Sequence, residues 1–360
     1  MESNRRAFLL GRRPPETPWA AFLRRLRRSC EGELRVEPAG GAGDAASGAA
    51  PGSAAWWRPA SAVDVRVARE LCAEYGVVMA LAETRGEAPG RLCLWVDPRS
   101  LNSLRRLDDG LPSTAAPAAG PVAPAATSVA PEPPAAAAAM AMGSRWRAGP
   151  GVTMATLAQA GLEQFAGLPG EMTVAAWLAS RAYAATGPGL ACPPGLISAD
   201  VMLADGALET LGPFGASGGV PLRSGTGQAL IPALYTLSTR ANAERCRAQA
   251  AWLARYRLDA LTPPPPAEAN LAGLLAGHEG ALAWLESAVL QATPPATGGA
   301  AGIGAPDPSA TPLPASAGGG GDASQDSAET SPYTADARAL DAYIKDAFDP
   351  AGMYPDAPVP

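Results

Sequence analysis

Apolar residues recur at helical spacing in two segments near the start of the chain, residues 18–30 and 64–74. In the first segment four apolar residues share one face, opposite a row of arginines: Trp19, Phe22, Leu23 and Leu26. The second segment lies between Ser61, a suitable N-cap, and Gly76, a suitable helix stop. We therefore predict a helix in each segment, the first of them docked by its apolar edge.

Short apolar runs predict strands at 77–81 and 91–97, joined by a loop around Arg85 and Gly86. With the preceding helix they make an opening of the β-α-β type. Strand-like and turn-like segments follow at 145–237. Residues 241–291 show two helical patterns, separated by prolines 263–266. The apolar residues of these two patterns are Leu253, Tyr256 and Leu258, then Leu271, Leu274, Leu275, Leu282, Trp284, Leu285 and Val289.

Two tracts, 111–143 and 293–331, consist almost entirely of small residues and proline. They lack apolar side chains large enough to build a core, so we predict disordered insertions, with a short alanine helix at 135–142 as the alternative in the first. The predicted organisation is an N-terminal helix and linker (1–53), a first subdomain (54–110), an insertion (111–143), a second subdomain (144–240), a helical segment (241–292), a linker (293–331) and a C-terminal helix and tail (332–360).

Charge and cysteine content narrow the classes of function. The net charge of −6 argues against a nucleic-acid-binding protein, and the arginines near the start are interleaved with acidic residues. The five cysteines are widely spaced without a C-x-x-C pair, so we expect neither a disulfide framework nor a zinc site. This cysteine usage favours a reducing compartment, and we therefore expect a cytoplasmic location. Residues 4–10 resemble a twin-arginine export signal, but charge and proline follow at 11–16, so we expect no export and no membrane span.

Several turns occur in a specific order. Residues 146–153 read as a strand and a glycine turn, Trp-Arg-Ala-Gly-Pro-Gly-Val-Thr, and a helix is expected at 154–161. Residues 168–174 contain a Pro-Gly-x-x-Thr turn, and residues 196–206 a strand that ends in an Asp-Gly hairpin. Residues 224–237 are expected to form a strand, with Pro232 limiting it to an edge or a bulge. A Lys-x-x-Phe-Asp-Pro-x-Gly element, 345–352, follows near the C-terminus.

This order resembles the FAD-binding domain of the para-cresol methylhydroxylase (PCMH) and vanillyl-alcohol oxidase superfamily, and within it the FAD-binding subunit of bacterial glycolate oxidase. The resemblance implies an α+β fold of two FAD-binding subdomains, with a short helical remnant at 241–292 in place of the substrate domain. It also implies noncovalent FAD, because the single histidine, His278, is expected in a solvated turn. The residues that the resemblance assigns to cofactor binding are Arg85, Gly86, Gly149, Gly151, Pro169, Gly170, Thr173, Val174, Gly187, Asp200, Gly225 and Gly227.

The chain departs from the family where glycine matters. The loop at 82–87 keeps one glycine and carries Glu83 and Glu87, whose negative charge opposes a diphosphate. A simple hairpin-like turn between two strands is the alternative for this loop. Ala175 and Ala176 replace a glycine pair, and Trp177 follows as a core residue or, in the alternative, a stacking platform for flavin.

Two functions remain open at this point. One is a FAD-dependent oxidoreductase acting on CH-OH groups, as the flavin-binding subunit of a dehydrogenase for 2-hydroxy acids, together with other subunits of an oxidase complex. The other is a degenerate, non-catalytic scaffold or partner subunit that no longer binds flavin. No residue can be assigned to catalysis, and one histidine without a local signature does not support a Ser-His-Asp or Cys-His site.

Overall fold

The computed structural model describes residues 16–36, 54–84, 91–107, 143–184, 187–189, 191–215, 219, 221–293 and 334–356. Residues 111–142 and 294–331 of the two expected insertions lie outside the described residues, as do Arg85, Gly86 and Glu87. The described chain combines helices with two separate sheets, as the α+β prediction requires.

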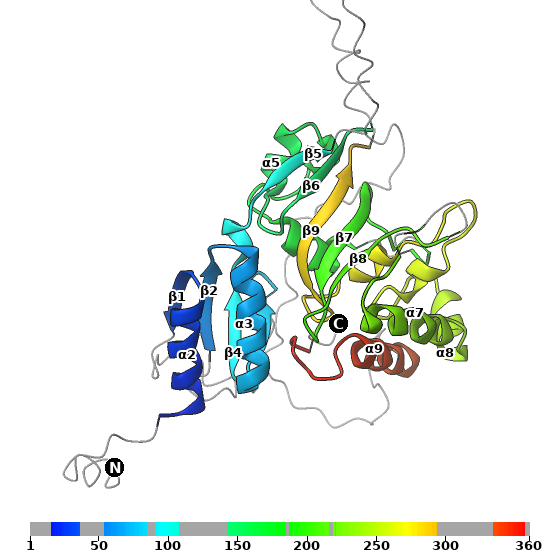
Figure 1. Ribbon diagram of the computed structural model, residues 1–360. Coiled ribbons are helices and arrows are strands. Elements are labelled where there is room, and N and C mark those ends of the chain that lie inside the picture. The colour runs from blue at the N-terminus through cyan, green and yellow to red at the C-terminus, as the bar shows by residue number, and fades with distance from the viewer. Residues whose placement is uncertain are drawn as a thin grey trace, which may run out of the picture.

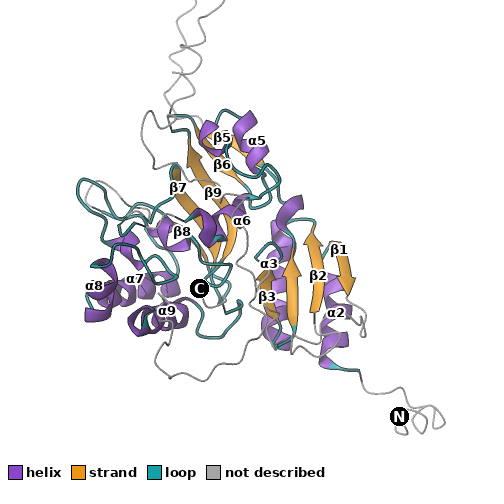
Figure 2. Ribbon diagram, turned by 180° about the vertical axis from the view of Figure 1, so that it is seen from behind, coloured by secondary structure: helices purple, strands orange, loops and turns teal. Residues whose placement is uncertain are grey.

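The first sheet has four strands in the order β1 (Gly32–Val36), β2 (Ala54–Pro59), β4 (Cys93–Val96) and β3 (Val78–Leu81). The last three run parallel, and β1 pairs antiparallel with β2 at one edge. Helices α2 (Pro18–Ser29) and α3 (Ala62–Tyr75) cover one face of this sheet (Figures 1 and 2). The β-α-β opening is thus confirmed, with β4 inserted between β2 and β3.

Both predicted N-terminal helices are confirmed, together with the signals that bound the second. The Ser61 hydroxyl accepts a hydrogen bond from the Asp64 amide at 3.3 Å, and Gly76 ends α3 with φ at +66°. The hairpin alternative for the loop after β3 is wrong, since β3 and β4 are parallel neighbours. Parallel strands cannot be joined by a tight turn.

The second sheet is antiparallel throughout, in the order β5 (Leu104–Leu107), β6 (Arg145–Ala148), β9 (Trp284–Gln291), β7 (Leu196–Met202) and β8 (Leu208–Leu211). The predicted Asp-Gly hairpin joins β7 to β8, and Gly206 has the positive φ, +89°, that the turn requires. Two short helices, α5 (Met154–Gln159) and α6 (Val174–Ala179), follow β6.

The predicted helical remnant at 241–292 is wrong. Its second half contains a 3₁₀ turn at Leu271–Leu275 and then β9, the central strand of the second sheet. Trp284, Leu285 and Val289 lie on this strand, and a central strand buries both of its faces, which produces a run of apolar residues that mimics a buried helix. The first half keeps only α8 (Ala241–Arg247) and a 3₁₀ turn at Leu258–Leu261.

The strand predicted at 224–237 is also wrong, because α7 (Gly225–Ser238) occupies these residues. Ser224 caps this helix by accepting a hydrogen bond from the Gly227 amide at 2.9 Å. Pro232 lies inside the helix on its exposed side. Helix α7 packs with α8 and with α9 (Ala335–Phe348), the expected C-terminal helix, beside the second sheet (Figure 1).

One hydrophobic core runs through both sheets, and Met79 and Leu81 of β3 contribute to it. The alternate residues of β3, Val78 and Ala80, belong to a smaller cluster on the other face of the first sheet. Both faces of this short strand are therefore buried. Among the described residues, none of the helices combines the length and the apolar character that a membrane crossing needs.

Candidate functional site

The glycine turn after β6 lies against the segment that links the two sheets. The Gly149 amide donates to the Ser103 carbonyl at 2.8 Å, and the Gly151 amide donates to the Leu101 carbonyl at 3.1 Å. A Cβ at Gly149 would lie 2.4 Å from the Leu101 oxygen, and one at Gly151 would lie 2.0 Å from the Pro98 oxygen. Glycine is needed here because two protein backbones approach closely, and both amides already have protein acceptors.

The Pro-Gly turn lies directly beside this glycine turn. Thr153 and Thr173 form an antiparallel bridge, and the Val174 amide donates to the Val152 carbonyl at 2.8 Å. The Met172 amide closes the turn on the Pro169 carbonyl at 3.0 Å, and the Gly170 carbonyl accepts from the Ala155 amide at 3.1 Å. The structure therefore brings together six of the predicted cofactor-binding residues: Gly149, Gly151, Pro169, Gly170, Thr173 and Val174.

The other predicted cofactor-binding residues that the structure describes do not join this group of six. The Gly187 carbonyl accepts a hydrogen bond from Arg257 Nη2 at 2.8 Å. Asp200 lies on β7, where Arg147 Nη1 contacts its Oδ2 at 2.6 Å. Gly225 and Gly227 belong to the first turn of α7. Arg85 and Gly86 are outside the described residues.

A carboxylate that the sequence marks as unfavourable for a diphosphate lies at the junction of the two sheets. Glu83 follows β3, and its Oε2 accepts a short hydrogen bond from the Thr173 hydroxyl. Its Oε1 accepts from Arg99 Nη2 at 3.1 Å. The Glu83 side chain is only 13% exposed, and burial raises its pKa although Thr173 and Arg99 act in the opposite direction. Glu83 thereby ties the loop of the first sheet to the Pro-Gly turn.

A second carboxylate accompanies Glu83. Arg58 Nη2 contacts Asp97 Oδ2 at 2.6 Å, and this bond raises the pKa of the Arg58 guanidinium. Arg99 Nη1 lies 3.9 Å from the same oxygen. In the described part of this junction, each of the two carboxylates is therefore paired with an arginine.

The helix after the Pro-Gly turn belongs to the core. Ala175 and Ala176, which replace the family's glycine pair, are both buried. Trp177 is 3% exposed, and its ring meets Phe165 edge to face at a centroid distance of 5.0 Å. The core interpretation of Trp177 is thus confirmed, and the ring is not available as a stacking platform.

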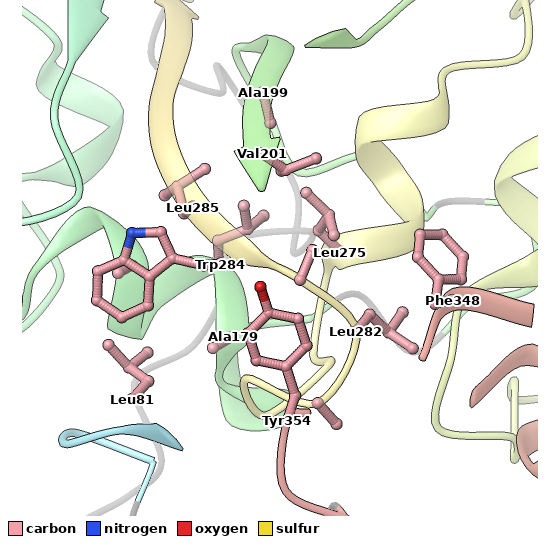
Figure 3. Close-up of a cluster of buried hydrophobic side chains, with 14 of the residues drawn as sticks. Leu81, Ala179, Ala199, Val201, Leu275, Leu282, Trp284, Leu285, Phe348 and Tyr354 are labelled. Carbon is pink, nitrogen blue, oxygen red and sulfur yellow. The ribbon is translucent and has the colours of Figure 1, made fainter. Parts of the chain in front are cut away.

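The space beside Ala175 is filled by side chains from β3, β9 and the C-terminal tail. Figure 3 shows the rings of Trp284 and Tyr354 packed among aliphatic side chains that include Leu81 and Leu285. The cavity that remains between them holds about 10 Å³, the size of one water molecule. Sites for small molecules and cofactors usually measure roughly 300–1,000 Å³, so this cavity is too small for a flavin ring.

His278 borders this cavity and is buried, so the expectation of a solvated turn residue is wrong. The turn is present, with Glu279 and Gly280 at positive φ, but it is folded inward against α6. Burial and the nearby Lys345 lower the pKa of His278 to about 3. The imidazole is therefore neutral at physiological pH.

The C-terminal element anchors the tail to both sheets. Buried Asp349 accepts hydrogen bonds from the amides of Met353 at 2.7 Å and Tyr354 at 2.8 Å, and Lys345 Nζ contacts it at 2.6 Å. The Met353 carbonyl accepts from the Met79 amide at 2.9 Å, at the edge of the first sheet. Sequence reasoning identified this element by resemblance but missed its structural role.

No protein-family model and no curated protein sequence matches this chain. Solved structures similar to it include an alkyldihydroxyacetonephosphate synthase (14% identity, TM-score 0.34, 68% of this chain and 32% of the other). A second is a 4-ethylphenol oxidase from Gulosibacter chungangensis in an isoeugenol complex (16% identity, TM-score 0.34, 67% of this chain and 35% of the other). A third is a cholesterol oxidase from B. sterolicum (14% identity, TM-score 0.34, 78% of this chain and 39% of the other). The chain spans between about a third and two fifths of the length of these proteins.

The described residues at the junction do not fit a flavin diphosphate. A diphosphate needs backbone amides or cations that face it, whereas the amides of Gly149, Gly151 and Val174 already donate to carbonyls. The charged groups described there are two carboxylates, Glu83 and Asp97, and the two arginines that already pair with them, so no cation is left for a diphosphate. Among the described residues there is also no group of three or more His, Cys, Asp or Glu side chains arranged to hold a metal ion.

Proposed function

We propose that this chain keeps the architecture of a FAD-linked oxidase domain without holding flavin, and that it acts as a non-catalytic partner subunit of an oxidase complex. The observation that carries the proposal is the position of Glu83. Its carboxylate accepts hydrogen bonds from Thr173 and Arg99, the donors that an anionic cofactor would need at this junction. A carboxylate of the protein thus takes the place of a bound phosphate.

A second candidate is the flavin-binding subunit of a dehydrogenase for 2-hydroxy acids, with noncovalent FAD. The Thr153–Thr173 bridge supports it, because this bridge aligns the glycine turn with the Pro-Gly turn as the resemblance implies. Under this candidate Arg85 and Gly86 would supply the cation and the close backbone approach that the described residues lack.

Flavin binding separates the two candidates. The full chain is purified from cells with ample flavin, and its absorbance between roughly 350 and 500 nm and its thermal unfolding are recorded with and without added FAD. The partner-subunit proposal predicts a colourless protein whose melting temperature does not respond to FAD, since only a ligand that binds the folded state raises stability. Flavin bands, or a melting temperature that rises with FAD concentration, would support the second candidate instead.

A pair of variants tests whether Glu83 is what prevents flavin from binding. Glu83→Gly removes the carboxylate and restores a glycine after β3, so FAD is expected to raise the melting temperature of this variant and not that of the wild type. Glu163→Gly, at an exposed position in a 3₁₀ turn, is the matched control. An absent response in Glu83→Gly would show that Glu83 alone does not exclude flavin.

A further inference from the structure

A polar cleft of about 300 Å³ opens on the second sheet, and it shares no lining residue with the Glu83 junction. Residues from α3, β6, β7, β8 and β9 line it, together with the loop before α7. Three of the lining residues are arginines: Arg66, Arg147 and Arg223. The volume lies at the lower end of the range for small-molecule sites.

Two of the carboxylates in the cleft are neutralised by arginines of the cleft itself. Asp200 accepts from Arg147 Nη1 at 2.6 Å and from the hydroxyls of Thr210 and Ser287, each at 2.7 Å. Glu286 Oε2 accepts from Arg66 Nη2 at 2.7 Å. These two ion pairs leave neither Arg66 nor Arg147 as a free cation.

The third carboxylate, Glu209, is 4% exposed and is satisfied by backbone rather than by an arginine. It accepts from the Arg223 amide at 3.0 and 3.1 Å and from the Ser224 amide, at the start of α7. Within the described residues the guanidinium of Arg223 itself has no hydrogen-bond or ion-pair partner, and the side chain is exposed at the cleft. Among the described residues, Arg223 is thus the one arginine of the cleft whose guanidinium pairs with no carboxylate.

The part of the cleft around Arg223 also offers apolar surface. Pro221 lies two residues before it, and Leu208 of β8 is 43% exposed although it is a large aliphatic side chain. We propose that this cleft binds a short aliphatic monocarboxylate, with its carboxylate on Arg223 and its carbon chain on Leu208 and Pro221. A monocarboxylate brings one negative charge for the Arg223 guanidinium, and the cleft has no second arginine without a carboxylate partner among the described residues.

Titration with propionate tests the proposal on the full chain at low ionic strength, by calorimetry or ligand-observed NMR. Saturable binding of propionate is expected, without saturable binding of propionamide, which has the same shape and no charge. Arg223→Gln should weaken propionate binding by about tenfold or more, as the loss of a charge-assisted hydrogen bond requires. Arg223→Lys should retain part of the affinity, and Leu208→Ser should weaken binding without changing the preference for the charged ligand.

Arg35→Gln is the matched control, because Arg35 is an exposed arginine on β1 that pairs only with Glu33 in the described structure. It should bind propionate as the wild type does. The absence of saturable propionate binding by the wild type would overturn the proposal, and so would equal affinity for propionamide or unchanged affinity in Arg223→Gln. This result is independent of flavin binding, so the two proposals can fail separately.

Discussion

The hydroxyl of Tyr354 donates a hydrogen bond to the Met202 carbonyl at 2.7 Å, which joins the C-terminal tail to the end of β7. Tyr354 is 2% exposed, and burial raises the pKa of its hydroxyl. The neighbouring Met353 contacts β3 of the first sheet. Two consecutive tail residues therefore fasten elements of both sheets, so the tail is a structural part of the fold.

Tyr354→Phe should lower the free energy of unfolding by about 1–3 kcal/mol, because it removes the donor to a buried carbonyl and leaves the ring packing intact. Urea denaturation measures this change. Tyr235→Phe is the control, since Tyr235 is 63% exposed, and it should stay within about 0.5 kcal/mol of the wild type. Equal stability of Tyr354→Phe and the wild type would contradict the anchoring role.

His278 should remain neutral in the folded protein far below the pH at which a free imidazole gains its proton. Its pKa is lowered from 6.5 to about 3 by burial and by Lys345. The unfolded chain takes up a proton below about pH 6.5 and the folded chain does not, so this residue reduces stability by about 1.4 kcal/mol per pH unit as the pH falls toward 3.

NMR can follow this residue directly because it is the single histidine of the chain. Its ring signals should not titrate between pH 7 and 4 while the protein is folded. The acid sensitivity of unfolding should be smaller in His278→Gln than in the wild type. A midpoint near 6.5 in the NMR titration would mean that the imidazole is solvated.

Gly151→Ala should destabilise the fold through a backbone clash. The new Cβ would lie 2.0 Å from the Pro98 oxygen, so the glycine turn and the segment between the sheets would have to separate. Overpacking of this kind costs about 1–3 kcal/mol or more. Gly167→Ala is the control, because nothing lies within 4 Å of its added carbon, and thermal unfolding of both variants provides the comparison.

Glu83→Gln should change the pH dependence of stability. Burial raises the pKa of Glu83 above 4.5, so the folded state holds this proton more tightly than the unfolded state does. The stability that the protonated form contributes is therefore lost as the pH rises from 4.5 through the raised pKa. Glutamine avoids this loss, and the variant should gain stability over the wild type as the pH rises toward neutrality. Glu163→Gln, at an exposed position, should give no such trend.

Local signals in the sequence were sufficient to predict the elements whose ends they mark. Helix α3 begins at its Ser61 cap and ends at Gly76, and the Asp-Gly turn at Gly206 fixes the β7–β8 hairpin. The glycine turn and the Pro-Gly turn also lie side by side, at the position where the resemblance predicts a site. Each of these features depends on residues close together in the chain.

The elements that sequence reasoning missed depend on distant partners. Strand β9 has apolar residues at both helical and strand spacing, and only its neighbours β6 and β7 decide between the two. The resemblance favours a strand at 224–237, although the Ser224 cap and the exposed position of Pro232 allow a helix. The hydrogen bond from Thr173 to Glu83 spans 90 residues, and nothing in either local sequence indicates it.

The central position of β9 has a consequence for the order in which the chain folds. Apart from β9, strands β6 and β7 each pair with a single neighbour, β5 and β8. Until residues 284–291 pair between them, the second sheet would consist of two separate antiparallel pairs, each with an unpaired edge that is open to other chains. Strand β9 closes both edges at once, so completion of this sheet requires pairing between residues far apart in the chain, the kind of contact that forms slowly.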